Sequence, residues 1–190
     1  MRPEGPAEPL DRPATARVFF ALWPPPVLAG KLADIAVTAA GRFGGKPTRR
    51  DTIHLTLAFL GDVAEARLPS LCASASRVVA RSFDLTVDRL GFWRHNHLLW
   101  AGYRAVPPAL PALVDELSAV LDQAGFVIAD RERRFAPHVT LLRKVPADDC
   151  QPLPAIDPLR WSCAHFVLVR SRLSAAGSSY QTLAEFPLLS

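Results

Sequence analysis

The stretch Thr52-Ile53-His54-Leu55-Thr56-Leu57-Ala58-Phe59-Leu60 contains a four-residue pattern that returns at His138-Val139-Thr140-Leu141. Each copy reads histidine, aliphatic residue, threonine, leucine. Side chains alternate between the two faces of a β-strand, so the histidine and the threonine of each copy share one face. The aliphatic residues take the other face. The pattern therefore predicts two strands that present two imidazoles and two hydroxyls to a shared cleft.

Hydrophobic periodicity outlines the remaining elements. The motif strands are predicted at 52–60 and 134–142, and further strands at 17–23, 83–92, 97–103, 159–168 and 180–186. Helices with an apolar stripe are predicted at 27–40, 64–80 and 109–124. This order predicts an α+β fold. Because each motif lies next to a long amphipathic helix, we interpret the chain as a pseudo-duplication of two α+β lobes.

Composition and charge are those of an ordinary soluble protein. The chain has 190 residues, of which 49% are hydrophobic and 21% charged. Residues 1–16, rich in proline, arginine, glutamate and alanine, are predicted to be a disordered tail, and residues 17–190 a single domain. The net charge of +4 fits an anionic ligand without requiring one.

Targeting and redox features indicate a cytoplasmic protein. No apolar run reaches the ~18 residues that span a bilayer, and the N-terminus lacks the apolar segment of a signal peptide. The three cysteines are widely spaced, which predicts no disulfide framework and favours a reducing compartment. We expect no membrane contact, no obligate protein partner and a monomer.

The two motifs suit acid–base chemistry on a phosphate ester. Imidazole titrates near neutral pH, so one histidine can accept a proton from the nucleophile while the other donates one to the departing oxygen. On the residues alone, these roles are interchangeable. The hydroxyls of Thr56 and Thr140 can donate to the non-bridging phosphate oxygens. A cyclic phosphodiester fits well, because its strained ring assists a modest acid and base.

A metal site is the weaker interpretation. Zinc sites need three or four ligands at close spacing, and no cysteine or third histidine clusters with either motif. His95 and His97 fall at a predicted hairpin, where we expect solvent-facing or rim residues, and His165 falls in a predicted strand, where we expect a core or structural role. We therefore predict no metal and no other cofactor.

Several further residues are candidates for the cleft. Arg143 lies close enough to the second motif to reach a phosphate, but strict alternation turns it away from His138 unless a bulge or a strand end intervenes. Arg50 and Arg134 are each an even number of residues from their motif histidine, so alternation would place them on the same face as that histidine. A solvated position suits each arginine equally well. Five aromatic residues are candidates for stacking on a base, of which we expect one or two to do so: Phe43, Phe59, Trp93, Tyr103 and Phe135.

The double motif resembles the paired H-x-T-x motifs of the two-histidine phosphoesterase superfamily. Within it, the chain is similar to the LigT/ThpR-like RNA 2′,3′-cyclic phosphodiesterases, also called the 2′-5′ RNA ligase family. The likeness runs from Arg17 to the C-terminus. It rests on four segments, of which the second and third contain the motifs: 17–22, 54–61, 135–141 and 180–188.

The resemblance implies a bilobal fold with a cleft between antiparallel sheets and helices on the outside. It implies that the protein is a hydrolase, which converts a terminal RNA 2′,3′-cyclic phosphate to a 2′-phosphate without a metal. His54 would be the proton donor to the departing 3′ oxygen and His138 the proton acceptor from water. Thr56 and Thr140 would bind the phosphate. Reversal with an RNA 5′-hydroxyl would join ends through a 2′-5′ linkage.

Two alternatives stay open. The substrate can be a small cyclic nucleotide, such as ADP-ribose 1″,2″-cyclic phosphate, or the chain can be a non-catalytic binder of RNA ends. A pure binder has no need of a matched acid and base, so the intact histidines favour an enzyme.

Overall fold

The computed structural model describes residues 14–129, 134–146, 152–174 and 177–190. The strands are β1 (Thr15–Leu22), β2 (Lys46–Pro47), β3 (Leu55–Ala64), β4 (Phe83–Val87), β5 (Arg89–Trp93), β6 (Leu98–Gly102), β7 (Val139–Arg143), β8 (Leu159–Cys163), β9 (His165–Ser174) and β10 (Gly177–Pro187). The helices are α1 (Pro26–Phe43), α2 (Leu68–Ala75) and α3 (Ala109–Gln123), with 3₁₀ turns at Arg50–Thr52, Glu65–Arg67 and Arg94–Asn96. The predicted mixture of helices and antiparallel strands is confirmed.

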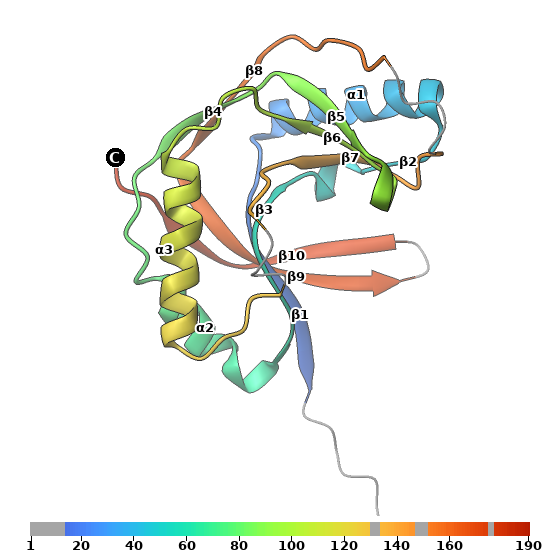
Figure 1. The fold of residues 1–190 in the computed structure, drawn as a ribbon. Coiled ribbons are helices and arrows are strands. Elements are labelled where there is room, and N and C mark those ends of the chain that lie inside the picture. Colours follow the sequence, from blue (N-terminus) through green and yellow to red (C-terminus); the bar gives the residue numbers. More distant parts are fainter. Residues whose placement is uncertain (1–13, 130–133, 147–151, 175–176) are drawn as a thin grey trace, which may run out of the picture.

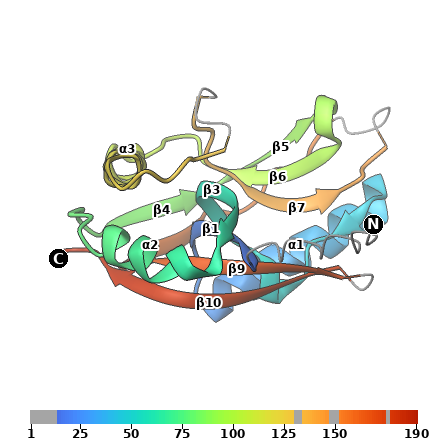
Figure 2. The same ribbon diagram turned by 90° about the horizontal axis from the view of Figure 1, so that it is seen from below.

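One large antiparallel sheet contains both motif strands. Its order is β10-β9-β1-β3-β7-β6-β5, with β2 added to β7, and β4 and β8 form a separate pair. The two halves of the large sheet meet between β3 and β7, where a single residue pair, Leu55 and Val139, is in register. This narrow junction divides the sheet into the two predicted lobes, which diverge in Figures 1 and 2.

The two halves repeat the same connection. In one, β1 leads through α1 to its antiparallel neighbour β3; in the other, β6 leads through α3 to its antiparallel neighbour β7. Each helix then packs on the opposite half: α1 contacts β7, and α3 contacts β3 and α2 (Figure 1). The predicted pseudo-duplication is therefore seen in the topology, and the exchanged helices tie the halves together.

The helices bury the apolar stripes that periodicity predicts. In α1 the buried stripe includes Leu28, Leu32 and Ala36, and in α3 it includes Leu113 and Leu117. These residues belong to one continuous core with the sheet, and each large apolar side chain fully buried there contributes about 1.5–3 kcal/mol. None of the described helices is both long enough and apolar enough to cross a membrane.

Two predicted strands are each divided in the structure. The predicted strand 83–92 splits at Asp88 into β4 and β5, and the predicted strand 159–168 splits at Ala164 into β8 and β9. In both cases the chain leaves the small sheet and enters the large one. The hydrophobic alternation changes phase at Asp88 and gives way to a continuous apolar run after Ala164. Neither corner contains a glycine or a proline, so the prediction continued each strand across it.

The predicted helix at 64–80 is wrong in extent. Strand β3 continues to Ala64, and the helix that follows the 3₁₀ turn covers only Leu68–Ala75. Near its end, the Ser76 hydroxyl donates to the carbonyl oxygen of Ala73, a local bond that competes with continuation of the helix. At the N-terminus, β1 begins at Thr15, so the last two residues of the predicted tail are in a strand; residues 1–13 lie outside the described residues.

Candidate active site

Both motif strands contain a bulge at the leucine of the motif. In β3, Phe20 and Ala21 of β1 pair with Ala58 and Thr56, which leaves Leu57 without a partner. In β7, Leu99 and Trp100 of β6 pair with Leu142 and Thr140, which leaves Leu141 out in the same way. An extra residue shifts the alternation by one position. Consistent with this shift, each bulged leucine and the residue after it are both buried.

The bulges decide which later side chains face the cleft. After the shift, Arg143 returns to the face of Thr140, and Phe59 returns to the face of Thr56. Arg143 is exposed, and its charge acts on both His54 and His138. The sequence required a bulge or a strand end for Arg143 to reach this face, and the bulge at Leu141 satisfies that condition.

The motif histidines lie immediately before their strands, and their rings are held in the same way. Nδ1 of His54 donates to the carbonyl oxygen of Thr52 at 2.7 Å, and Nδ1 of His138 donates to the carbonyl oxygen of Ala136 at 2.8 Å. A carbonyl oxygen only accepts, so each Nδ1 carries the hydrogen. In the neutral rings, Nε2 therefore holds the lone pair. Nε2 of His54 lies 3.1 Å from the hydroxyl oxygen of Thr56.

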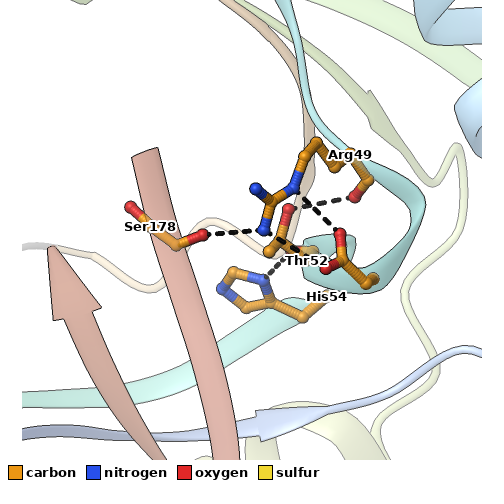
Figure 3. A network of polar contacts seen from close by, with 5 residues as sticks. Arg49, Thr52, His54 and Ser178 are labelled. Atoms are coloured by element: carbon orange, nitrogen blue, oxygen red, sulfur yellow. Dashed lines mark hydrogen bonds and ion pairs between the residues drawn. The ribbon is translucent and has the colours of Figure 1, made fainter. Parts of the chain in front are cut away.

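A short polar network fixes the backbone that carries the first of these carbonyls (Figure 3). Arg49 forms a two-point ion pair with Asp51, at 3.1 and 3.2 Å, and also donates to the carbonyl oxygen of Ser178 in β10. The Thr52 hydroxyl donates to the carbonyl oxygen of Arg49. This network anchors the turn before β3 to the far strand β10, and with it the orientation of His54.

Aromatic rings surround the two histidines unequally. The ring of His54 lies within 4.9–5.6 Å, between centroids, of Phe19, Trp23 and Tyr180. The ring of His138 contacts one aromatic side chain, Trp93, at 4.5 Å and 67°. His54 therefore lies in the drier environment.

Burial lowers the pKa of both histidines. Desolvation of the imidazolium is the main cause, and it takes the pKa of His54 from 6.5 to about 4. The pKa of His138 is lowered for the same reason, and the Arg143 guanidinium adds to both shifts. The hydrogen bonds to Thr52 and Ala136 act in the opposite direction. Both rings are thus neutral at pH 7 in the unliganded protein, and an anion in the cleft would favour their protonated forms.

Two pockets border this site. The first, which we call the α3 pocket, has a volume of about 510 Å³ and is lined by His138, Thr56, Trp93, Phe135 and residues of α3. The second, the β2 pocket, has a volume of about 300 Å³ and is lined by Thr52, Tyr180, Lys46, Arg143 and residues of β2 and β10. The α3 pocket thus borders His138 and also Thr56, the partner of His54 Nε2. The β2 pocket borders Thr52 and Tyr180, which contact His54 as well.

Known proteins resemble this chain over most of its length. Residues 22–100 match the family described as LigT like phosphoesterase. The chain is 31% identical to the RNA 2′,3′-cyclic phosphodiesterase of Escherichia coli (strain K12), over 90% of this chain and 96% of the relative. It belongs to the LigT-like phosphoesterases.

Other members of the LigT-like family extend the comparison. The RNA 2′,3′-cyclic phosphodiesterase of Thermus thermophilus is 30% identical over 90% of each chain. The crystal structure of E. coli LigT complexed with 3′-AMP superposes with a TM-score of 0.84 at 28% identity, covering 93% of this chain and all of that one. The fold of the LigT-like phosphoesterases is therefore present over almost the whole chain.

The structure places only some of the candidate aromatic residues and arginines at the cleft of this LigT-like phosphoesterase. Of the five candidate aromatics, Phe59, Trp93 and Phe135 line the α3 pocket, whereas Phe43 and Tyr103 are buried in the core. Arg134 lines the same pocket. Arg50 does not face the cleft: it donates to the carbonyl oxygen of Pro26 at the start of α1.

Sequence reasoning missed the aromatic residues around His54. Phe19 lies in a strand that reads as apolar throughout, so its cleft-facing position shows no contrast with its neighbours. His165 is exposed, so its predicted core position is wrong. Among the residues described, no three His, Cys, Asp or Glu side chains are grouped to hold a metal ion.

Proposed function

We propose that this LigT-like phosphoesterase hydrolyses the terminal 2′,3′-cyclic phosphate of RNA to a 2′-phosphate. The observation that carries the proposal is the matched pair of imidazoles, each held at Nδ1 by the carbonyl oxygen two residues before it. The names of the relatives support this choice of substrate. A matched acid and base is what hydrolysis of a phosphodiester requires.

In the proposed reaction, Nε2 of His138 accepts a proton from water while the water oxygen attacks phosphorus. The bond from phosphorus to O3′ breaks, and Nε2 of protonated His54 donates its proton to the departing O3′. The product keeps the phosphate on O2′. The division of labour between the histidines is taken from the family resemblance. The drier environment of His54 strengthens its hydrogen bond to the departing oxygen.

Thr56, Thr140 and Arg143 are proposed to bind the phosphate. The hydroxyls donate to the non-bridging oxygens, and the guanidinium balances the charge that builds on them. Lys46 of β2 pairs directly with Arg143 across the strands. Like charges at opposed positions repel each other, and an anion between them relieves that repulsion. We therefore assign the RNA that carries the cyclic phosphate to the β2 pocket.

The first test is product analysis. An oligonucleotide that ends in a 2′,3′-cyclic phosphate is incubated with the protein in the presence of EDTA, and the product is compared with 2′- and 3′-phosphate standards. We expect the 2′-phosphate, with EDTA without effect, because a histidine acid and base need no metal. A 3′-phosphate product would mean that O2′ departs in place of O3′. Loss of activity in EDTA would contradict the proposed mechanism.

The pH profile gives a second prediction. In the free protein, His54 has a pKa of about 4, and that of His138 is below 6.5. The productive form needs a protonated His54 and a neutral His138, so we expect kcat/KM to peak below pH 6.5 and to fall about tenfold per pH unit above neutrality. The optimum of kcat should lie at higher pH, because the bound anion raises both pKa values.

Stability must be followed in parallel. The lowered pKa values mean that the unfolded chain binds more protons between pH 6.5 and 4, so the stability present above pH 6.5 is lost as pH falls through this range. Circular dichroism at each pH separates this loss of stability from a loss of catalysis. A kcat/KM optimum above pH 7.5 with the fold intact would contradict the assigned roles of His54 and His138.

The cytoplasmic location and the monomeric state stay predictions.

A further inference from the structure

The two motif copies hold their histidines alike, but the backbone before each histidine is restrained differently. In the second copy, Pro137 lies between His138 and Ala136, whose carbonyl oxygen accepts from the ring. The proline ring fixes its own φ at about −65° and restricts the residue before it. In the first copy Ile53 takes this place, with a φ of −70° and a ψ of 124°. Ile53 thus has the φ of a proline without the ring that imposes it, so other contacts must hold this backbone.

Arg49 is the centre of those contacts (Figure 3). Its guanidinium donates to both carboxylate oxygens of Asp51, at 3.1 and 3.2 Å, and to the carbonyl oxygen of Ser178 at 3.0 Å. Its own carbonyl oxygen accepts from the amide of Thr52 at 2.9 Å and from the Thr52 hydroxyl at 3.0 Å. The carbonyl oxygen of Thr52 in turn accepts from Nδ1 of His54. A continuous chain of contacts therefore runs from β10 through Arg49 to His54.

The same contacts hold one of the aromatic residues beside His54. Ser178 and Tyr180 are two positions apart in β10 and therefore lie on the same face of the strand. The ring of Tyr180 meets the ring of His54 edge-on, at 5.3 Å between centroids and 89°. By holding Ser178, Arg49 also fixes the part of β10 that carries this ring.

A direct contact with the phosphate is the competing role for Arg49, because it lines the β2 pocket. Three of its N–H groups are already used, however, and the Asp51 carboxylate balances its charge. Arg143 lines the same pocket and is the cation whose charge acts on both histidines. The side chains of Arg49 and Asp51 are 52% and 69% exposed, and exposed ion pairs add little to stability. The fold gains little from this pair, which favours a role in the site.

We propose that Arg49 is a positioning residue that aims Nε2 of His54 at the departing O3′. It acts through the carbonyl of Thr52, and Asp51 and Ser178 hold it in place. The inference rests on the function proposed above, in which His54 is the proton donor. Catalysis depends steeply on geometry, because a misplacement of about 1 Å can cost about 100-fold in rate. A small shift of the turn before β3 is therefore enough to slow the reaction while the fold stays intact.

The test separates proton donation from phosphate binding. Two substrates are compared, an oligonucleotide with a 2′,3′-cyclic phosphate and the same oligonucleotide with sulfur in place of O3′. A thiolate leaves without a proton near neutral pH, so only the oxygen substrate needs a correctly placed His54. Arg49→Met removes both the charge and the forked donors, whereas Arg49→Lys keeps the charge alone. Arg104→Met is the matched control, because Arg104 is also exposed, lies 4.0 Å from Asp88 and is outside the lining of both pockets.

We expect Arg49→Met and Arg49→Lys to lower kcat for the oxygen substrate about tenfold, with KM within about threefold of the wild type. On the sulfur substrate both variants should stay within about threefold of the wild type, and Arg104→Met should match it on both substrates. A phosphate ligand would behave differently, because KM would rise on both substrates and the lysine variant would keep most of the activity. That result, an equal fall of kcat on both substrates, or no effect of Arg49→Met would overturn the proposal.

Asp51→Asn provides a check that leaves Arg49 unchanged, and thermal unfolding shows whether each variant is folded. The amide keeps the shape of the side chain and removes the charge that holds Arg49. If Arg49 positions His54, kcat falls on the oxygen substrate alone. If Arg49 binds the phosphate, its release lowers KM, and this result would overturn the proposal. Failure of the sulfur substrate to rescue His54→Ala would instead refute the donor role of His54, and with it the function on which this inference rests.

Discussion

Replacement of His138 or of His54 by alanine is expected to lower kcat/KM for a 2′,3′-cyclic phosphate by about 100-fold or more. Positioned proton transfer contributes about 10²–10⁴-fold to such reactions, and each ring is already oriented by its backbone carbonyl. The double variant should lose little more than either single one, because an acid and a base that act in one step are not additive. Steady-state kinetics on an oligonucleotide substrate measures all three.

The two single variants can be told apart by the leaving group. A substrate with sulfur in place of O3′ expels a thiolate, which needs no proton near neutral pH because thiols have a pKa of about 8.5. We expect this substrate to restore much of the activity of His54→Ala and none of that of His138→Ala. Rescue of His138→Ala instead would mean that His138 is the proton donor and His54 the proton acceptor.

His165→Ala is the matched control for these variants. His165 is exposed at the start of β9 and lies outside the lining of both pockets, so its loss should leave the rate unchanged. A non-catalytic binder of RNA ends would show a different result. In that case His54→Ala and His138→Ala would weaken binding of the oligonucleotide, and no substrate would be turned over by the wild type.

Gly91→Ala is expected to destabilise the fold by about 1–3 kcal/mol and to lower activity as well. The indole of Trp100 lies across Gly91 and Gly102, and a Cβ at Gly91 would overlap the six-membered ring of that indole. The displaced ring would disturb Trp93, whose centroid lies 5.3 Å from that of Trp100 and 4.5 Å from that of His138. Thermal unfolding and kcat/KM, measured on the same preparation, record both effects.

Two further variants test whether the contact with Trp100 causes the loss of stability: a control at another glycine and a compensating change at Trp100. Gly41 lies in α1, and the position that a Cβ would take there is open, so Gly41→Ala should be neutral or stabilise by up to about 1 kcal/mol. Trp100→Leu in the Gly91→Ala background should recover part of the lost stability, because the smaller side chain leaves room for the methyl group. Equal stability of Gly91→Ala and wild type would show that Trp100 moves without cost.

Strong local periodicity explains why much of the fold is predictable from the sequence. The helices at 27–40 and 109–124 have regular apolar stripes, and the structure has α1 at Pro26–Phe43 and α3 at Ala109–Gln123. The predictions fail where no periodic signal marks the event. The corners at Asp88 and Ala164 contain neither glycine nor proline, so nothing in the sequence marks them as turns. The short α2 is preceded by a strand that continues past Gly61.

The site shows the same division between local and long-range information. His54, Thr56, His138 and Thr140 follow from a repeated motif and the period of two in a strand. The aromatic residues around His54 do not, because Phe19, Trp23 and Tyr180 come from segments that are distant in sequence and meet only through the pairing of β1 with β3 and β9, and of β9 with β10. The lowered pKa of His54 results from that burial.

The two imidazole–hydroxyl pairs, each on one face of a strand, follow from the motif alone, because alternation is a local property of the backbone. Which further side chains share that face depends on how the strands pair. The bulges at Leu57 and Leu141 arise from pairing with β1 and β6, and they turn Phe59 and Arg143 back toward the cleft. A bulge depends on the hydrogen bonds of the neighbouring strand, and that neighbour is not encoded within the motif.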